Sequence, residues 1–335
     1  MWANGAWGLA AFRRLALLGA VLAAGVVVLG AWVRLTDAGL GCPDWPGCYG
    51  HLYPQGDQPA GKAWHEMIHR YAAVTLGIVI ALLLVWAVAR RRDRAQPLIP
   101  VALLFAVVCL QGALGALTVT LLLKPLIVTA HLFGGLTTLS LLWWLSLTPE
   151  QRTPATQELT LRPFALIALA ILAVQIFLGG WTSTNYAAVA CPDFPTCQRA
   201  WWPTMDFHDA FVLWRGVHLD FEGGVLANPA RVAIHFTHRL GAGVTAAVLV
   251  SLGAITAWRA RSLRLSRAGL LLMGAVLLQV SIGIATVQLG FPLGLGTLHN
   301  AGAALLVVAL VWLLCALWPE PPVSVVPFVH ADRAQ

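Results

Sequence analysis

Long apolar stretches recur eight times along the chain, and the short segments between them hold most of the charged residues. A helix needs about 20 mostly apolar residues to cross the roughly 30 Å hydrocarbon core of a bilayer, and each stretch reaches that length. The stretches are continuous rather than alternating, which excludes a strand-built barrel. The pattern therefore predicts eight membrane-spanning helices, at about residues 12–34, 66–89, 97–120, 125–147, 163–182, 231–258, 268–290 and 293–318.

Composition agrees with this pattern and narrows the class of protein. Of the 335 residues, 59% are hydrophobic and only 10% are charged, and the mean hydropathy is +0.77. Soluble domains carry about 25% charged residues, and disordered chains are poor in the aliphatic and aromatic residues that are frequent here. An ordinary soluble enzyme and a disordered chain are therefore excluded. The expected fold class is an all-α integral membrane protein embedded in a lipid bilayer.

Arginine is distributed unequally between the two sides of the predicted spans. One side holds Arg13, Arg14, Arg90, Arg91, Arg92, Arg94, Arg152, Arg162, Arg259, Arg261, Arg264 and Arg267. The loops of the other side hold only Lys62, Lys124, Arg199 and Arg215. The positive-inside rule predicts that the arginine-rich side and both termini are cytoplasmic. This topology accounts for the net charge of +7, so we expect no nucleic-acid partner. The first span could also be a signal peptide, but it has full spanning length and ends in Arg34.

Two long outer loops, at about 35–65 and 183–230, each contain a cysteine pair. The pairs stand in CPDWPGC at 42–48 and CPDFPTC at 191–197. Disulfides persist in oxidising compartments, so we expect the disulfides Cys42–Cys48 and Cys191–Cys197, and a redox role for the first pair stays open. The other two cysteines, Cys109 and Cys315, lie inside spans, where we expect small buried apolar residues.

The chain repeats itself. The cysteine motif recurs after 149 residues, and the segment 66–70 recurs after 169 residues at 235–239. Gln111 and His131 recur as Gln279 and His299 after 168 residues. The second outer loop therefore contains an insertion of 20 residues. Fixed-period similarity predicts a tandem duplication, here of two four-helix bundles, residues 1–150 and 151–335. Because each half has an even number of spans, we expect a pseudo-two-fold axis along the membrane normal.

Four histidines lie a few residues inside the even-numbered spans, near the outer leaflet: His69, His131, His238 and His299. Polar groups at this depth are costly and usually functional. Each half holds one pair, and opposed histidines on facing helices of a bundle can ligate a haem iron. Histidines hydrogen-bonded within the bundle remain an alternative. Zinc is less favoured because it takes three or four close ligands. Several glycines nearby leave room for a flat ligand or allow close helix packing; they are Gly112, Gly115, Gly134, Gly135, Gly283, Gly296 and Gly302.

Charged residues beside the histidines differ between the halves. Glu66 lies three residues before His69, and His235 occupies the matching position of the second half. A carboxylate on the same helix face as a haem ligand is a candidate base or electrostatic stabiliser, although a charge near a helix start also interacts with the helix dipole. The first half is therefore the predicted place of chemistry. Arg70 and Arg239 could pair with haem propionates or anchor at the interface. Loop and tail histidines are expected to have surface roles: His51, His208, His218 and His330.

Several of these segments resemble the haem A synthase family: EMIHRY at 66–71, GGWTSTNYAAVACPDFPTCQ at 179–198 and LHN at 298–300. Members of that family oxidise a ring methyl of haem O to the formyl group of haem A, through hydroxymethyl and gem-diol stages. The resemblance implies that His238 and His299 hold a resident haem b. It implies that His69 and His131 bracket the substrate haem O and that Glu66 is the essential acid of the family.

The resemblance also implies a place in the cell and partners. It points to the bacterial cytoplasmic (inner) membrane, with the cysteine-containing loops on the outer face. Haem O synthase and oxidase assembly factors are candidate partners, and a homo-oligomer stays open. Two other functions remain. A di-haem b-type cytochrome would place haems near opposite membrane faces, whereas all four histidines lie near one face. A haem transporter would need broken helices, and no span has a mid-helix Pro-Gly break.

Overall fold

A computed structural model describes residues 5–55, 60–93, 96–216 and 219–319. Arg94, His218, His330 and the tail after residue 319 lie outside the described residues. Eight helices of the described chain are long and apolar enough to cross a membrane. They are α1 (Gly5–Leu35), α2 (Ala60–Ala89), α3 (Leu98–Thr120), α4 (Pro125–Ser146), α6 (Leu161–Thr184), α8 (Asn228–Arg259), α9 (Leu263–Gln288) and α10 (Leu293–Leu317). Three short helices complete the list: α5 (Thr156–Leu159), η1 (Ala188–Ala190) and α7 (Phe207–Ala210).

The eight predicted spans are confirmed as helices, but several helices extend beyond their apolar run. Helix α2 begins at Ala60 rather than 66, and α9 begins at Leu263 rather than 268. At the start of α9 the hydroxyl of Ser262 accepts a hydrogen bond from the main chain of Leu265 at 3.4 Å. A capped polar turn continues a helix without being apolar, so hydropathy alone underestimates helix length.

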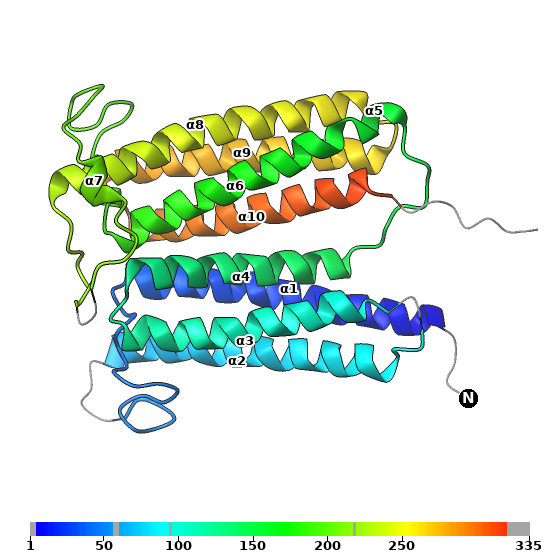
Figure 1. Cartoon of the computed structure of the whole chain (residues 1–335), viewed down its shortest axis with the longest axis horizontal. Coiled ribbons are helices and arrows are strands. Elements are labelled where there is room, and N and C mark those ends of the chain that lie inside the picture. Colours follow the sequence, from blue (N-terminus) through cyan, green and yellow to red (C-terminus); the bar gives the residue numbers. More distant parts are fainter. Residues whose placement is uncertain (1–4, 56–59, 94–95, 217–218, 320–335) are drawn as a thin grey trace, which may run out of the picture.

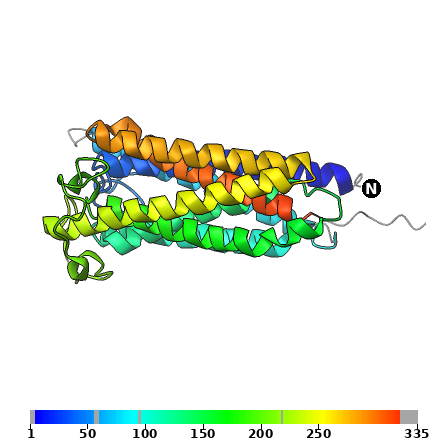
Figure 2. The same ribbon diagram turned by 90° about the horizontal axis from the view of Figure 1, so that it is seen from above.

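The long helices form two groups of four (Figure 1). Helices α1 to α4 make the lower group, and α6, α8, α9 and α10 make the upper group. All eight run along the same long axis, as Figure 2 also shows. Each group has its own core of buried aliphatic side chains. The groups meet where α1 packs on α10, α4 packs on α6, and α4 packs on α10.

Polar contacts join the two groups at the end that carries the long loops. The Arg34 guanidinium donates to the Ser183 carbonyl at 2.8 Å and lies 4.1 Å from the ring centroid of Tyr186. The Tyr186 hydroxyl donates to the Asp37 carboxylate at 2.9 Å. Arg34 and Ser183 are 149 residues apart, and so are Asp37 and Tyr186. Residues 149 positions apart, the same offset as that of the two cysteine motifs, therefore contact each other directly.

The second long loop folds over the outer end of the first group. The main chain of Phe221 donates to the Leu122 carbonyl at 3.1 Å. Lys124 is buried, donates to the Arg215 carbonyl at 3.1 Å and lies 3.7 Å from the ring centroid of Trp214. Residues of this loop therefore cover the α3–α4 turn.

Cys109 does not have the predicted burial. It is exposed on α3, and Cys315 is half-buried. The prediction for Cys109 is wrong because α3 buries little of its surface: only 11% of its most apolar window is buried within the protein. A bilayer accepts an apolar side chain on the outer face of a bundle as readily as in its core, so hydropathy does not identify the facing side.

Candidate functional site

The structure brings the four intramembrane histidines together as two opposed pairs. The rings of His69 on α2 and His131 on α4 have centroids 6.5 Å apart and planes at 85°. The rings of His238 on α8 and His299 on α10 have centroids 6.4 Å apart and planes at 87°. Each pair links the second and fourth long helix of its group, as the sequence predicts. The two pairs have nearly the same geometry.

The spacing of each pair fits a metal bound between two imidazoles. Nitrogen ligands about 2.0–2.1 Å from a metal on opposite sides leave ring centroids about 6 Å apart. The Nδ1 atoms of His69, His131 and His299 are buried and form no hydrogen bond within the described residues. In that same part of the chain, no group of three or more histidine, cysteine or acidic residues could hold a metal ion. The histidine pairs therefore suit two axial ligands of a haem iron.

A glycine lies against each of the four imidazoles. A Cβ added to Gly30 would be 3.0 Å from His69, and one on Gly179 would be 3.2 Å from His238. The corresponding distances are 3.5 Å from Gly115 to His131 and 2.9 Å from Gly283 to His299. Gly30 and Gly179 are not among the glycines predicted from the sequence, although their 149-residue spacing, the same as that of the cysteine motifs, is a signal for them. These glycines let neighbouring helices approach the imidazoles closely.

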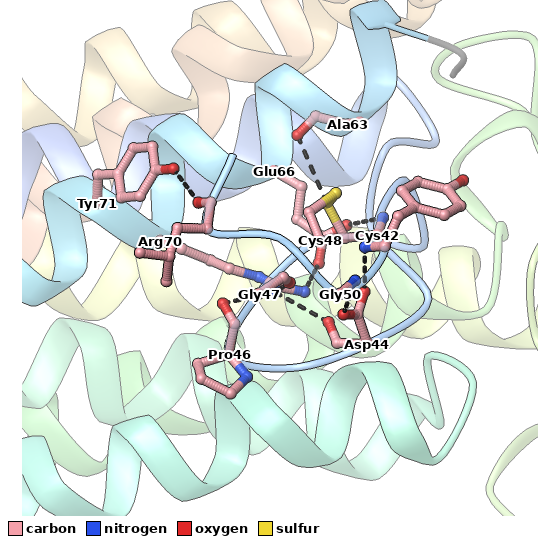
Figure 3. The surroundings of a disulfide bond; sticks show 12 residues. Cys42, Asp44, Pro46, Gly47, Cys48, Gly50, Ala63, Glu66, Arg70 and Tyr71 are labelled. Atoms are coloured by element: carbon pink, nitrogen blue, oxygen red, sulfur yellow. Dashed lines mark hydrogen bonds and ion pairs between the residues drawn. A yellow bond between two sulfur atoms is a disulfide. The ribbon is translucent and has the colours of Figure 1, made fainter. Parts of the chain in front are cut away.

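Glu66 is buried, with 4% of its surface exposed, and it contacts the first disulfide loop (Figure 3). Its carboxylate accepts a hydrogen bond from the main chain of Cys42 at 2.8 Å. It also forms an ion pair with Arg70, one helical turn later. In the second half His235 takes this place, and the Nε of Arg239 contacts it at 3.2 Å. The first site therefore contains a buried negative charge that the second lacks.

The two arginines clamp the disulfide loops onto their helices. Arg70 donates to the carbonyls of Asp44, Pro46 and Gly47 at 3.0, 3.2 and 2.5 Å. Arg239 donates to the carbonyls of Cys191, Asp193 and Thr196 at 2.8, 2.8 and 2.9 Å. From the sequence, these guanidinium groups are expected to bind haem propionates or to anchor at the membrane interface. The structure adds a third set of partners, the loop carbonyls.

Both predicted disulfides, Cys42–Cys48 and Cys191–Cys197, are present. An aspartate in each loop accepts main-chain hydrogen bonds: Asp44 from Tyr49 and Gly50, and Asp193 from Gln198 and Arg199. The hydrogen bond from Gly50 is the main cause that lowers the pKa of Asp44 below its ordinary range. For Asp193, burial acts to raise the pKa, but hydrogen bonds from Thr196 and the main chain outweigh it and lower the pKa.

Comparison with known proteins agrees with this site. The sequence model of a family described as "cytochrome oxidase assembly protein" (COX15-CtaA) matches residues 13–311. The chain is 43% identical to a haem A synthase of Shewanella oneidensis over 312 residues, 88% of this chain and 92% of that protein. The chain belongs to the haem A synthase family.

More distant members of the haem A synthase family align over similar lengths. The protein of Caulobacter sp. (strain K31) is 29% identical over 326 residues, 86% of this chain and 90% of the relative. That of Halalkalibacterium halodurans is 27% identical over 320 residues, 91% of this chain and 97% of the relative. The family match at 13–311 includes both histidine pairs and both disulfide loops.

Proposed function

We propose that this protein is a haem A synthase, a membrane oxidoreductase that converts a ring methyl group of haem O into the formyl group of haem A. The reaction passes through hydroxymethyl and gem-diol stages, and each oxidation removes two electrons, which leave through the resident haem, the disulfides or an outside acceptor. The observation that carries this proposal is the presence of two opposed histidine pairs in a chain 43% identical to a haem A synthase over 88% of its length.

The two histidine pairs have different tasks in this proposal. His238 and His299 hold a resident haem b, which supplies an electron-transfer group when bound. His69 and His131 bracket haem O, the substrate. The support is the difference beside the first ligand of each pair: a buried carboxylate at Glu66 in one half and an imidazole at His235 in the other. At this position, three residues before the first ligand, the first half has an acidic side chain and the second half does not.

Glu66 stabilises positive charge that develops at the methyl carbon, or orients the attacking water. A preorganised charge in a dry site stabilises a transition state more than the same charge in water does. The main-chain N–H of Cys42 and the guanidinium of Arg70 hold the carboxylate in a fixed orientation. That arrangement ties the position of the catalytic charge to the first disulfide loop. Arg70 and Arg239 retain the additional task of binding haem propionates in this proposal.

The proposal includes a duplicated architecture, with residues 1–150 and 151–335 related by a pseudo-two-fold axis along the membrane normal. Matching residues meet across the interface of the halves, as Arg34 does with Ser183. Left-handed backbone conformations also recur at matching positions, with φ of 54° at both Tyr49 and Gln198. These repeated details support a common ancestry of the halves.

For localisation, we propose the bacterial inner membrane, with both termini in the cytoplasm and both disulfide loops outside. The support is the arginine distribution, together with the eight apolar helices. The haem O substrate reaches the protein from haem O synthase, and oxidase assembly factors receive the product.

The decisive experiment is pigment extraction from membranes that contain this protein and a supply of haem O. A new formyl-haem peak is the expected result. Two tightly bound haems and no formyl haem would overturn the proposal in favour of a di-haem electron-transfer protein. Export of unmodified haem O would favour a transporter.

A further inference from the structure

Each histidine of the His238/His299 pair is accompanied by a glutamine from a neighbouring helix. The Nε2 of Gln175 on α6 donates to the His238 carbonyl at 3.0 Å and lies 3.0 Å from the His238 Nδ1. The Nε2 of Gln279 on α9 donates to the His299 carbonyl at 2.9 Å and lies 3.4 Å from the His299 Nε2. A side-chain amide can donate or accept by turning over, so either glutamine can hold its imidazole in one orientation.

The glutamine side chains need space, and a glycine three residues after each histidine provides it. A Cβ at Gly241 would overlap the Gln175 amide, and one at Gly302 would overlap the Gln279 amide. We call this combination of histidine, neighbouring glutamine and following glycine the amide brace. The same residue types occur in the first half, where a Cβ at Gly134, three residues after His131, would overlap the Gln111 amide, but the Gln111 Nε2 forms no hydrogen bond within the described residues.

His69 is the exception. Val26 occupies the position that matches Gln175, 149 residues earlier, and Ala72 occupies the position that matches Gly241, 169 residues earlier. Helices α1 and α2 are in the same register as helices α6 and α8, because Gly30 contacts His69 as Gly179 contacts His238. Val26 offers His69 only its main-chain carbonyl, and the His69 Nδ1 forms no hydrogen bond of normal geometry within the described residues. Both parts of the brace are therefore replaced at one histidine in four.

A partner on the far nitrogen of a histidine fixes the orientation of the ring and its affinity for a metal. The imidazoles of His238 and His299 have an amide partner before any haem arrives, and His131 has the Gln111 amide beside its helix. The unbraced imidazole of His69 can turn about its side-chain torsions without breaking a hydrogen bond to a neighbouring side chain. A site that must release its haem after each turnover needs one such ligand, whereas a site for a resident haem does not.

We propose that His69 is the exchangeable ligand of the first-half site, and that the replacement of the brace by Val26 and Ala72 allows substrate haem to enter and product haem to leave. The His131 imidazole keeps its position, with or without haem bound, while the His69 imidazole moves. This inference rests on the proposed function, which assigns the substrate to His69 and His131. His69 is the ligand on the same helix as Glu66, one turn away, so exchange occurs on the side of the catalytic charge.

The test installs the missing brace. Purified full-length Val26→Gln/Ala72→Gly protein is loaded with protohaem as a non-reacting probe, and haem loss to excess apomyoglobin is followed by absorbance. Wild-type protein should lose haem in a fast phase from the first half and a slow phase from the second. The installed brace should slow the fast phase about ten- to a hundred-fold, the usual effect of an outer partner on metal affinity. Val26→Leu/Ala72→Gly is the matched control, since it creates the same space without an amide.

The reverse variant, Gln175→Val/Gly241→Ala, keeps the inference testable if the first variant does not fold. It should accelerate the slow phase by a similar factor and leave the fast phase unchanged. Unchanged haem loss in both brace variants would overturn the inference. If wild-type protein makes no formyl haem although the brace variants change haem loss as expected, the proposed function fails and the assignment of His69 as the exchangeable ligand stands. If wild-type protein makes haem A and the haem-loss rates do not respond, only the inference fails.

Discussion

A single carboxylate distinguishes the two histidine sites at the scale of the residue. Glu66 is the one acidic residue of α2, and it is buried between the main chain of Cys42 and the Arg70 guanidinium. A buried carboxylate that only held the loop could be exchanged for a neutral acceptor at modest cost. A carboxylate that stabilises a developing charge could not be replaced by a neutral acceptor without a large loss of rate. The Glu66→Gln variant separates these two roles.

We expect Glu66→Gln protein to fold, keep its resident haem and bind haem O, but to lose most conversion. Gln retains an acceptor for the Cys42 N–H and removes the negative charge. Loss of one well-placed electrostatic group costs about 3–4 kcal/mol, or roughly a hundred- to a thousand-fold in rate. Haem extraction that quantifies haem O, the hydroxymethyl intermediate and haem A measures the loss.

The second half provides the control for this variant. His235→Gln changes the matching position and should leave conversion near the wild-type rate, because no catalytic charge is removed. Near-normal haem A from Glu66→Gln would remove this residue from the mechanism. Accumulation of the hydroxymethyl species would assign Glu66 mainly to the second oxidation.

The ligand histidines should respond differently to substitution in the two halves. Replacement of His238 or His299 by Ala should release the resident haem and lower the thermal stability of the protein, because a haem bound to the folded state stabilises it. Replacement of His69 or His131 should leave a six-coordinate haem spectrum and abolish conversion. Absorbance spectra and pyridine haemochrome assays of the four purified variants provide the comparison. Equal haem loss from all four would contradict the division of labour.

The residue scale also marks the limit of the sequence analysis. The four histidines could be predicted because polar residues are rare within spans and because these histidines recur at nearly the same sequence offset. The loop partners of Glu66 and Arg70 could not be predicted. They are main-chain groups, and their positions depend on the fold of the whole loop and not on the identity of one residue. Val26 was overlooked for a different reason. Its significance appears only when the structure aligns it with Gln175.

At the scale of the element, each disulfide loop is a separate small unit on the end of a helix. The disulfide closes it, an aspartate accepts from its main-chain N–H groups, and an arginine of the helix binds its carbonyls. The first loop also sets the position of the Glu66 carboxylate through the main chain of Cys42. A looser loop should therefore reduce conversion without a change in any haem ligand.

We expect Asp44→Asn to make the first disulfide easier to reduce, by roughly three- to tenfold in rate, because charge-assisted hydrogen bonds to a half-exposed carboxylate are lost. The second disulfide should be unaffected in this variant. In Asp193→Asn protein, the second disulfide should be reduced faster and the first should be unaffected. Mass spectrometry after timed reduction distinguishes the two loops. Equal acceleration of both disulfides by either variant would indicate global unfolding instead.

The same carboxylate gives the loop a defined pH dependence. Because folding lowers the pKa of Asp44 below its ordinary 3.8, its stabilising contribution is complete above that pH and is lost as the pH falls through the lowered value. Resistance of the first loop to a phosphine reductant should then be constant from neutral pH to about pH 5. A loss of resistance already between pH 7 and 6 would implicate another group.

Helix identity was predictable at the element scale, but helix ends and facing sides were not. Span length and apolar composition located all eight long helices. The extra residues of the second outer loop could be counted from the repeat offset. Their contact with Lys124 and Leu122 of the other half could not, because tertiary contacts between a loop and a distant turn leave no periodic pattern.

At the scale of the whole molecule, the two ends of the helical body differ in chemistry. The disulfide loops lie together at one end, and α1 begins and α10 ends at the other (Figure 1). The histidine pairs belong to the end with the loops, since they lie near the starts of α2, α4, α8 and α10. Both haem sites would therefore sit near one membrane surface, which suits exchange with that surface better than electron transfer across the bilayer.

Two explanations account for the concentration of arginines at one end of the molecule. The positive-inside rule explains it by the insertion of the chain into the membrane. Two of these arginines also bind main-chain carbonyls at the end of α10: Arg152 contacts Ala316 at 3.2 Å, and Arg162 contacts Leu317 at 3.0 Å. Cations at a helix C-terminus are stabilising in any topology. Only a direct measurement of sidedness distinguishes a topological signal from a structural one.

We expect the arginine-rich end to be cytoplasmic, because Arg13, Arg14 and Arg90–Arg92 lie at the same end and, within the described residues, none of them binds the end of α10. The measurement labels single cysteines with a membrane-impermeant maleimide in a Cys109→Ser/Cys315→Ser background, where the disulfide-bonded cysteines do not react. Leu213→Cys, exposed in the second outer loop, should label in intact cells. Thr153→Cys, exposed in the α4–α6 connection, should label only after the membrane is permeabilised. Labelling of both sites under denaturing conditions controls for reactivity. The reversed pattern in intact cells would assign the arginines to helix capping and move both proposed haem sites to the cytoplasmic surface.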